Sequence, residues 1–203
     1  MVEQRIRDLV TSTGITYSFR QVTLRFETPA SGDAFARKNN KSLGQTLLDR
    51  RYRTLAPEAA IFAEAMQVPL GEFLLVLKRS GNPFYKRFLN NHGDLPYSIF
   101  KIDDPVVLRS KGVYAYYVSD DLRYIGRCKD TMRRRINQGY GKIYPKNCYL
   151  DGQRTNCRLN AMITEMRKDL SLWFCPLDKG SEITAVEADL IRRYRPPWNA
   201  RGW

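Results

Sequence analysis

Long apolar runs, internal repeats and low-complexity tracts are all missing from this sequence of 203 residues. No apolar stretch approaches the roughly 18 residues that a membrane-spanning helix needs. The N-terminal segment MVEQRIRDLV is amphipathic and partly acidic, unlike a secretory signal. We therefore expect no membrane partner and a soluble, cytoplasmic protein. Because 43% of the residues are hydrophobic, we also expect a real core.

Clustered metal ligands of the zinc type are missing too. The sequence holds one histidine, His92, and four cysteines, none of them in a CxxC pair: Cys128, Cys148, Cys157 and Cys175. This spacing does not indicate a zinc site. It favours small buried hydrophobic side chains in a reducing compartment.

Positive charge is what the sequence has in excess. Lysine and arginine number 34 against 21 acidic residues, which gives a net charge of +13. Residues 106–203 carry 19 basic and 10 acidic side chains and so hold most of the excess. Such a balance favours a polyanionic partner, most often nucleic acid, although a generally basic protein is the alternative. Tyrosines placed among arginines strengthen the first interpretation, because rings and guanidinium groups stack on bases and pair with phosphate.

The first part of the chain, residues 1–105, is predicted to form a mainly helical domain. We expect a short helix over 2–10, a strand over 17–26, and helices that begin at Ser42, Pro57 and Pro69. The last two are separated by a residue or two, with Ala63 where a close helix crossing would need a small side chain. This spacing fits a DNA-reading helix-turn-helix and fits a plain structural bundle as well.

The second part, residues 106–203, is predicted to form an α+β domain with a small antiparallel sheet flanked by helices. A hairpin over 112–128 precedes helical TMRRRINQ, a helix over 157–169, a strand over 172–176 and a helix over 181–194. Alternation in the first hairpin strand places Val113, Ala115 and Tyr117 on one face and Tyr114, Tyr116 and Val118 on the other.

Gly126 interrupts the second hairpin strand where a side chain would stand. A glycine within a strand often marks the close approach of another backbone or of a ligand. Arg127 follows it directly, and three consecutive arginines, 133–135, come soon after. Tyrosine hydroxyls and guanidinium groups beside a bare backbone suit a phosphate.

Glu187 lies in the apolar stripe of the last helix, beside Val186, Leu190 and Ile191. A carboxylate that faces a core is costly unless it is paired or binds a cation. Glu187 is therefore a candidate metal ligand, and a salt bridge to Arg134 or another arginine, or a different helix phase, is the alternative.

Together these residues resemble the GIY-YIG nuclease family. Gly112-Val113-Tyr114 and Tyr124-Ile125-Gly126 match its two motifs, with nine residues between them. Arg134 follows Gly126 by eight residues, Glu187 opens EADLIRRYRPPWN, and Asn199 comes twelve residues after it. The match covers about half of the chain. The ordered set at family spacing is specific, whereas either tripeptide alone would be weak.

The resemblance implies a metal-dependent endonuclease. One Mg²⁺ (or Mn²⁺) ion per site would bind Glu187 and a phosphate oxygen. Tyr114 would be the general base, its phenolate favoured by nearby cations, and Tyr124 would orient water or phosphate. Arg134 would neutralise the charge that builds on phosphorus, and Asn199 would steady the site.

One position departs from the family pattern. Four residues after the helix arginine, where relatives carry histidine or tyrosine, this chain has Gln138, with Tyr140 two residues further. Either Tyr140 reaches the site from a distorted helix end, or the site relies on Tyr114 alone. The insert YGKIYPKNCYLDGQRTNCRLN is either a DNA-facing loop or a structural connection. The expected DNA contacts are Gly126, Arg127, Gln138, Tyr140, Lys142, Lys146, Arg154 and Arg158.

The function that these observations favour is cleavage of DNA, most simply double-stranded, by a restriction-type or defence endonuclease. A repair or mobile-element nuclease is the alternative within the class. A DNA-binding protein that kept the fold without the activity is the alternative outside it. Double-strand cleavage by one such site requires either a homodimer or two successive cuts.

Overall fold

The computed structural model describes residues 5–199, and in this part the chain forms two compact units. The first, which we call the sheet unit, contains residues up to 28, residues 99–142 and residues from 165 onward. The second, the helical unit, contains residues 29–98 and 143–164. None of the helices between residues 5 and 199 has the length and apolar character needed to cross a bilayer.

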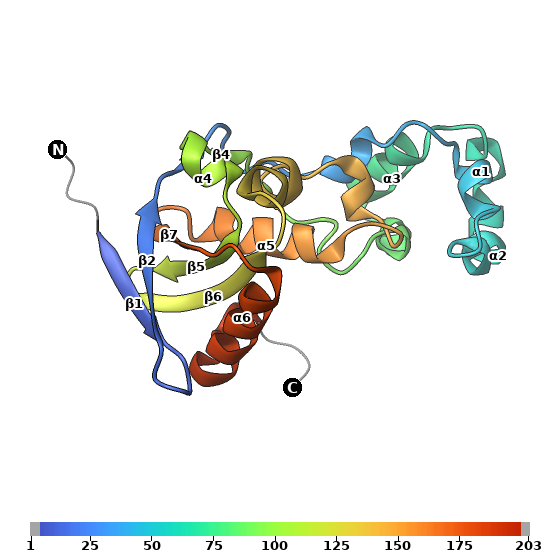
Figure 1. Ribbon diagram of the computed structural model, residues 1–203. Helices are drawn as coiled ribbons and strands as arrows, with labels where there is room; N and C mark the ends of the chain where they lie inside the picture. The colour runs from blue at the N-terminus through green and yellow to red at the C-terminus, as the bar shows by residue number, and fades with distance from the viewer. Residues whose placement is uncertain (1–4, 200–203) are drawn as a thin grey trace. The chain divides into compact units, whose positions relative to one another are not determined.

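A five-stranded antiparallel sheet in the order β1-β2-β7-β5-β6 forms the centre of the sheet unit (Figure 1). Its strands are β1 (Ile6–Val10), β2 (Thr16–Val22), β5 (Gly112–Val118), β6 (Asp121–Cys128) and β7 (Leu170–Pro176). The hairpin β5–β6 and the strand β7 were predicted from the sequence. Strand β6 forms the outer edge of the sheet.

The predicted fold class is wrong in where it places the sheet. The N-terminal strands β1 and β2, blue in Figure 1, belong to the same sheet as the hairpin, because β2 pairs with β7. The short helix expected over 2–10 is therefore replaced, in its described part, by a strand. A helix of that length has little stability of its own, whereas as a strand the segment buries Leu9 beside Phe19 in the core of the sheet.

Helices cover both faces of this sheet. Helix α6 (Gly180–Tyr194) packs on one face, where its Ile183, Val186 and Leu190 meet the strand residues Val113 and Ala115. The opposite face carries Tyr114 and Tyr116, which lie against the helix Arg133–Tyr140 (η5), wound as a π-helix. The alternation predicted for the hairpin strand is thus confirmed. The short helix α4 (Pro105–Arg109) begins at Asp104, whose carboxylate caps it.

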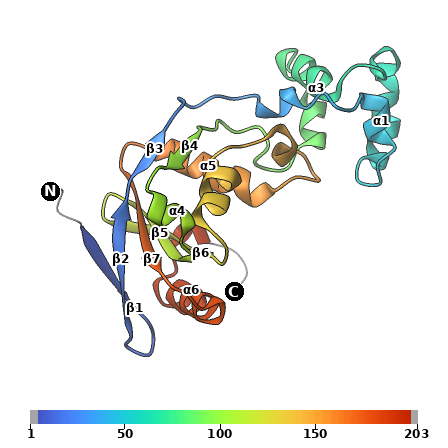
Figure 2. The ribbon, with the colours of Figure 1, turned by 45° about the horizontal axis from the view of Figure 1, so that its top comes forward.

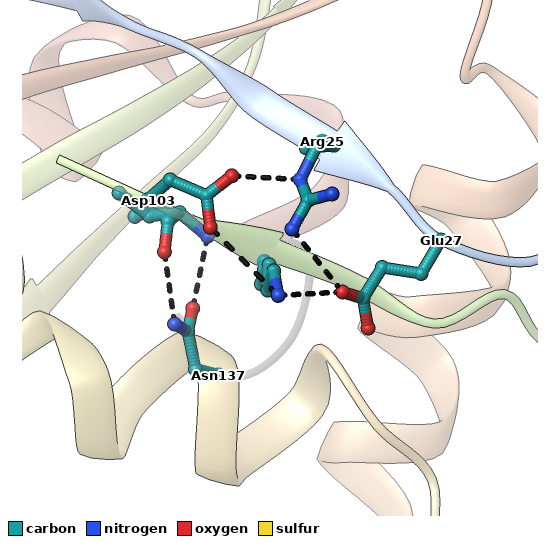
Figure 3. Close-up of polar contacts among 6 residues, drawn as sticks. Arg25, Glu27, Asp103 and Asn137 are labelled. Carbon is teal, nitrogen blue, oxygen red and sulfur yellow. Dashed lines mark hydrogen bonds and ion pairs between the residues drawn. The ribbon is translucent and has the colours of Figure 1, made fainter.

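A second, two-stranded sheet holds η5 in place. Strands β3 (Leu24–Phe26) and β4 (Phe100–Ile102) pair antiparallel, as Figure 2 shows. The Asn137 side chain on η5 accepts a hydrogen bond from the backbone N–H of Ile102 and donates one to its carbonyl, both at 2.9 Å (Figure 3). Arg25 and Lys101 bridge Glu27 and Asp103 across the outer side of the same strands. Helix η5, which carries Arg133, Arg134 and Arg135, is therefore held to β4 at its middle.

The helical unit consists of short helices around one aromatic core. They are η1 (Ala34–Arg37), α1 (Leu43–Leu47), η2 (Arg53–Leu55), α2 (Ala56–Ala59), η3 (Ala60–Ala65), α3 (Leu70–Arg79), η4 (Pro83–Phe88), η6 (Pro145–Cys148) and α5 (Arg154–Glu165). The predicted N-cap at Ser42 is confirmed, since its side chain accepts from Gln45 in a capping box.

Of the two helices expected to begin at Pro57 and Pro69, the second is found as α3, with Pro69 at its N-cap, and the first differs from the prediction. The first member is a short α-helical turn continued as a 3₁₀-helix, with a kink at Phe62. Ala63 is exposed, so it does not lie at a close helix crossing.

Candidate active site

Four tyrosine rings gather on the face of the hairpin opposite α6. Tyr114 and Tyr116 come from β5, Tyr124 comes from β6 and Tyr140 comes from the end of η5. The centroid of the Tyr114 ring lies 6.0 Å from those of Tyr116 and Tyr124 and 6.5 Å from that of Tyr140. Tyr114, Tyr116 and Tyr140 are fully buried or nearly so, whereas Tyr124 is partly exposed.

Gly126 makes room for this cluster rather than for a ligand. It stands opposite Tyr114 in the β5–β6 ladder. A Cβ atom at this position would lie 2.6 Å from the Tyr114 hydroxyl oxygen and 2.6 Å from the Tyr124 ring. The interpretation of Gly126 as a phosphate contact is therefore corrected: the space beside its backbone is filled by tyrosine side chains.

Tyr140 reaches the cluster, and Gln138 does not. The backbone of η5 departs from helical geometry at Gly139 (φ −95°, ψ −115°). This kink turns Tyr140 inward, where its hydroxyl hydrogen-bonds that of Tyr116 at 2.9 Å. Gln138 is exposed. Of the two alternatives for this departure, the geometry fits the one in which Tyr140 enters from a distorted helix end.

Arg135, not Arg134, is the arginine that contacts the candidate base. The Nε of Arg135 donates to the Tyr114 hydroxyl at 2.9 Å, and its guanidinium lies 5.7 Å from the Tyr140 ring centroid. Arg134 is 70% exposed and pairs instead with Asp130, one turn earlier. Arg135 was not predicted as a site residue, because the family spacing from Gly126 points to its neighbour Arg134. The π-helical winding of η5 decides which of them faces the tyrosines.

Burial governs the titration of Tyr114. The absence of solvent raises the pKa of the Tyr114 hydroxyl well above its usual value of 10.0, and the neighbouring Tyr124 and Tyr140 act in the same direction. Arg135 opposes this shift without overcoming it. The expected cationic lowering of the Tyr114 pKa is thus present but outweighed, and the resting hydroxyl is neutral.

Glu187 projects from α6 and pairs with Arg127 of β6. An Arg127 Nη1 atom lies 2.6 Å from Glu187 Oε2, and the Glu187 side chain is only 15% exposed. Burial raises the pKa of Glu187 above its usual 4.5, while Arg127 and then Arg135 pull it back. In this structure Glu187 thus forms the salt bridge that was given as the alternative to a metal ligand, and its partner is Arg127. Among residues 5–199, Arg127 is the residue that hydrogen-bonds this carboxylate.

A pocket of about 470 Å³ opens where these groups meet, at the outer edge of β6. We call it the edge pocket. Its lining has four basic and two acidic side chains, and it consists of Arg127, Cys128, Lys129, Asp130, Thr131, Arg134, Arg135 and Glu187. Tyr114 does not line this pocket. It is linked to the pocket through Arg135, which does line it and which donates a hydrogen bond to the Tyr114 hydroxyl. The arrangement can hold a phosphate between guanidinium groups, with the Glu187 carboxylate beside it and Tyr114 behind Arg135.

Asn199 supports the edge strand. Its side-chain oxygen accepts from the backbone N–H of Ile125 and its amide donates to the Ile125 carbonyl, both at 2.7 Å. The amide thus imitates a neighbouring strand at the outer edge of β6, next to Tyr124 and Gly126. These two hydrogen bonds are compatible with the steadying role that the resemblance implies for Asn199.

The fit of a divalent cation rests on Glu187 alone. No group of three or more histidine, cysteine or acidic side chains that could hold a metal ion occurs within the described chain. Mg²⁺ commonly keeps several waters and binds through one or two carboxylates plus substrate phosphate. The largely buried carboxylate of Glu187 suits such an ion when a substrate phosphate lies among the cations of the pocket, and Arg127 would have to share or leave Glu187 Oε2.

The remaining predicted DNA contacts fall into the two units. Lys142 belongs to the sheet unit and is exposed. Lys146, Arg154 and Arg158 belong to the helical unit, where the first two are exposed and the third is partly buried. The insert that carries them also has a structural part, since Tyr149 is fully buried and its hydroxyl donates to the Phe35 carbonyl at 3.0 Å.

Comparisons of the chain with models of protein families, with curated proteins and with solved structures find no match. A proposal for function has to stand on the edge pocket and on the motifs that form it.

Proposed function

We propose that this chain is a metal-dependent DNA endonuclease of the GIY-YIG type, which hydrolyses phosphodiester bonds at the edge pocket. The observation that carries the proposal is the hydrogen bond from Arg135 to Tyr114 beside the largely buried Glu187, at a pocket with more basic than acidic groups. A restriction-type or defence role in the cytoplasm, on double-stranded DNA, is the biological setting that we propose with it. A double-strand break would come from a homodimer or from two successive cuts.

The arginines would bind and stabilise the reacting phosphate. Arg127 and Arg135 are held by Glu187 and Tyr114, so their guanidinium groups are oriented before the substrate arrives. Fixed donors of this kind stabilise charge that develops in a transition state without reorganising. Arg134, more exposed and paired only with Asp130, is better placed for a flanking phosphate.

Tyr114 would accept the proton of the attacking water, and for this Arg135 would have to move aside, because the Tyr114 hydroxyl is fully buried and does not line the edge pocket. The Arg135 N–H points at its hydroxyl oxygen, the direction that stabilises a phenolate as it forms. Because burial keeps the pKa of Tyr114 above 10.0, the phenolate is scarce at neutral pH and becomes commoner as the pH rises. Tyr140 and Tyr116 hold the ring from behind.

Glu187 would be the protein ligand of one Mg²⁺ or Mn²⁺ ion. When bound, such an ion supplies positive charge to a non-bridging phosphate oxygen. Glu187 must be ionised for this, and Arg127 favours its ionised form.

A non-catalytic DNA-binding protein is the second candidate. The observations in its favour are the complete burial of Tyr114 and the pairing of Glu187 with Arg127, which together leave the two central groups occupied by side chains. The presence of the whole family set Tyr114, Tyr124, Arg134, Glu187 and Asn199 favours the enzyme, as does the contact of Arg135 with Tyr114.

Nicking of supercoiled plasmid separates the two candidates. The wild type with Mg²⁺ or Mn²⁺ is expected to cut, and chelation is expected to stop cleavage. The Glu187→Gln variant should lose activity by at least about a thousandfold while still binding DNA, because the carboxylate is replaced by a neutral amide of the same shape.

The matched control is Glu182→Gln, a carboxylate on the same helix outside the edge pocket. It should cut as fast as the wild type. Intact plasmid with the wild type and with Glu187→Gln, over many substrates and both metals, would reject the enzyme in favour of the binding protein.

A further inference from the structure

The run Arg-Lys-Asn-Asn-Lys at residues 37–41 lies outside the edge pocket and has no part in the proposed chemistry. It connects η1 to α1 in the helical unit. The residues Tyr144, Pro145 and Lys146, about a hundred positions later, lie opposite it across a hollow of about 540 Å³. We call this hollow the lysine pocket; its lining is Arg37, Lys38, Asn39, Asn40, Tyr144, Pro145 and Lys146.

The two walls of the lysine pocket are joined through the core of the helical unit. Tyr149, just after η6, donates its hydroxyl hydrogen to the carbonyl of Phe35 in η1. The Lys38 ammonium lies 4.1 Å from the centroid of the same Tyr149 ring. These two contacts connect the segment of Lys38 with the segment that follows Lys146, so the two walls of the pocket are held together.

A smaller hollow of about 120 Å³ adjoins the lysine pocket and shares Lys38, Asn40 and Lys146 with it. Lys41 is a further cation there, and Asp49 and Asp151 are the acidic groups. Asp151 is bound by the Tyr52 hydroxyl at 2.7 Å. Two concave sites side by side, with cations common to both, suit the successive phosphates of a polymer rather than one isolated anion.

The positive charge of the pocket is only partly balanced in the part of the chain that the structure describes: Asp151 and Asp49 attract Lys38 without forming an ion pair with it. Among residues 5–199, no carboxylate lies within 4.0 Å of the charged nitrogens of Arg37, Lys38, Lys41 or Lys146. Burial lowers the pKa of Lys38, and repulsion from Lys41 and Lys146 adds to the shift, whereas Asp151 and Asp49 oppose it. An anion bound between these cations would relieve their repulsion.

Groups that suit a nucleic acid surround these cations. The Tyr144 ring is 48% exposed at the rim, where it offers a stacking surface for a base. Asn39 and Asn40 are exposed and can donate to phosphate or meet a base edge.

We propose that the lysine pocket is a second DNA-binding site, which grips backbone phosphates away from the bond that is cut. The identification of DNA as the ligand rests on the proposed function. The site itself deepens that function, since it gives the helical unit a way to hold the substrate that does not depend on a helix-turn-helix.

The test compares DNA affinity in three variants without divalent metal, so that no cutting occurs. The first is the triple variant Arg37→Gln/Lys41→Gln/Lys146→Gln, which leaves Lys38 on Tyr149. The second, a control, is Arg50→Gln/Arg53→Gln/Arg79→Gln, which removes the same charge from exposed positions of the same unit that line neither hollow. The third is the charge-conserving Arg37→Lys/Lys41→Arg/Lys146→Arg.

Fluorescence anisotropy with a labelled duplex, over a range of salt concentrations, should separate them. The pocket variant should bind at least about tenfold more weakly than the wild type at about 0.1 M salt, and its log K against log salt slope should be shallower by about two to three. The control should lose much less affinity, and the charge-conserving variant should bind almost as the wild type does. Matching thermal unfolding curves would show that the pocket variant still folds.

Equal affinities for the pocket variant and the control, with a wild type that binds and cuts DNA, would overturn the lysine pocket and leave the proposed function standing. A wild type that binds DNA through this pocket and yet cuts nothing would reject the proposed function and leave the pocket standing. Tighter binding of an RNA duplex of the same sequence would overturn DNA as its ligand.

Discussion

The edge pocket and the lysine pocket are both basic, but their cations are held in opposite ways. In the edge pocket Arg127 is paired with Glu187, Arg134 with Asp130, and Arg135 with the Tyr114 hydroxyl. In the lysine pocket no carboxylate of the described chain forms an ion pair with Arg37, Lys38 or Lys146. The three arginines of the edge pocket are oriented by direct partners, whereas the cations of the lysine pocket feel Asp49 and Asp151 only from beyond ion-pair distance.

Oriented cations and cations without ion pairs suit different tasks. A site that stabilises a transition state gains from donors that are already fixed, because no reorganisation is then needed during the reaction. A site that only attracts a polyanion gains from uncompensated charge, since each neutralised phosphate releases counterions. If both proposals hold, chemistry belongs to the sheet unit and affinity to the helical unit.

Replacing the two neighbouring arginines of the edge pocket should give the largest difference. We expect Arg135→Ala to slow cleavage by about 10²–10³, because it removes the donor to Tyr114 and a phosphate contact. Arg134→Ala should slow cleavage by less than about tenfold, since its side chain is exposed and meets only Asp130.

Single-turnover rates at saturating DNA measure this contrast. Arg135→Lys, which keeps the charge but not the planar fork, should recover only part of the activity. A larger loss from Arg134→Ala than from Arg135→Ala would return the catalytic role to Arg134 and contradict the geometry of η5.

The pH dependence of cleavage should show the buried tyrosine. Below its raised pKa, the phenolate fraction of Tyr114 grows about tenfold per pH unit, so the rate should keep rising from neutral to alkaline pH. At acid pH the rate should fall as Glu187 takes up a proton, at a pH above the ordinary 4.5 of a glutamate. Rates of wild type and Tyr114→Phe over this range provide the measurement. A wild-type rate that levels off near neutrality, with the same profile in Tyr114→Phe, would remove Tyr114 as the base.

The free energy of unfolding should fall more when a cation that forms an ion pair is replaced than when a cation without an ion pair is replaced. Arg127→Gln is expected to lower the free energy of unfolding by about 1–2 kcal/mol at neutral pH, because Glu187 is left buried without its partner. Lys41→Gln should change the free energy of unfolding by no more than about 0.5 kcal/mol.

The sign of the pH effect follows from Glu187. Its folded-state pKa is raised by burial and rises further without Arg127, so the folded variant binds a proton more readily than the unfolded chain. The penalty of Arg127→Gln is therefore complete well above the folded-state pKa of Glu187 in the variant. It shrinks as the pH falls through that pKa and reaches its minimum below the folded-state pKa of the wild type, which itself lies above 4.5. Denaturant titrations at neutral and acid pH test this; a penalty that does not change with pH would show that the Arg127–Glu187 pair contributes nothing specific.

Asparagines that imitate a neighbouring strand show why some contacts that support the fold were not predicted from the sequence. Asn199 on Ile125, Asn137 on Ile102 and Asn160 on Ser98 each use the side-chain amide to pair with both polar groups of one backbone residue. Only Asn199 was singled out, through its place in a family motif. Nothing in the local pattern of an asparagine tells which strand edge it will meet.

The sequence by itself determined the local elements and their faces: the hairpin with Tyr114 and Ala115 on opposite sides, the Ser42 cap, and Glu187 in the apolar stripe of α6. These follow from periodicity and capping, which act over a few residues. The tertiary structure alone decided that β1 and β2 join the hairpin's sheet, that Arg135 rather than Arg134 meets Tyr114, that tyrosine rings fill the space at Gly126, and that residues 37–41 face Lys146. Each of these depends on packing between segments that lie far apart in the chain. Side-chain volume and the pairing of backbone groups select that packing only when the whole unit folds.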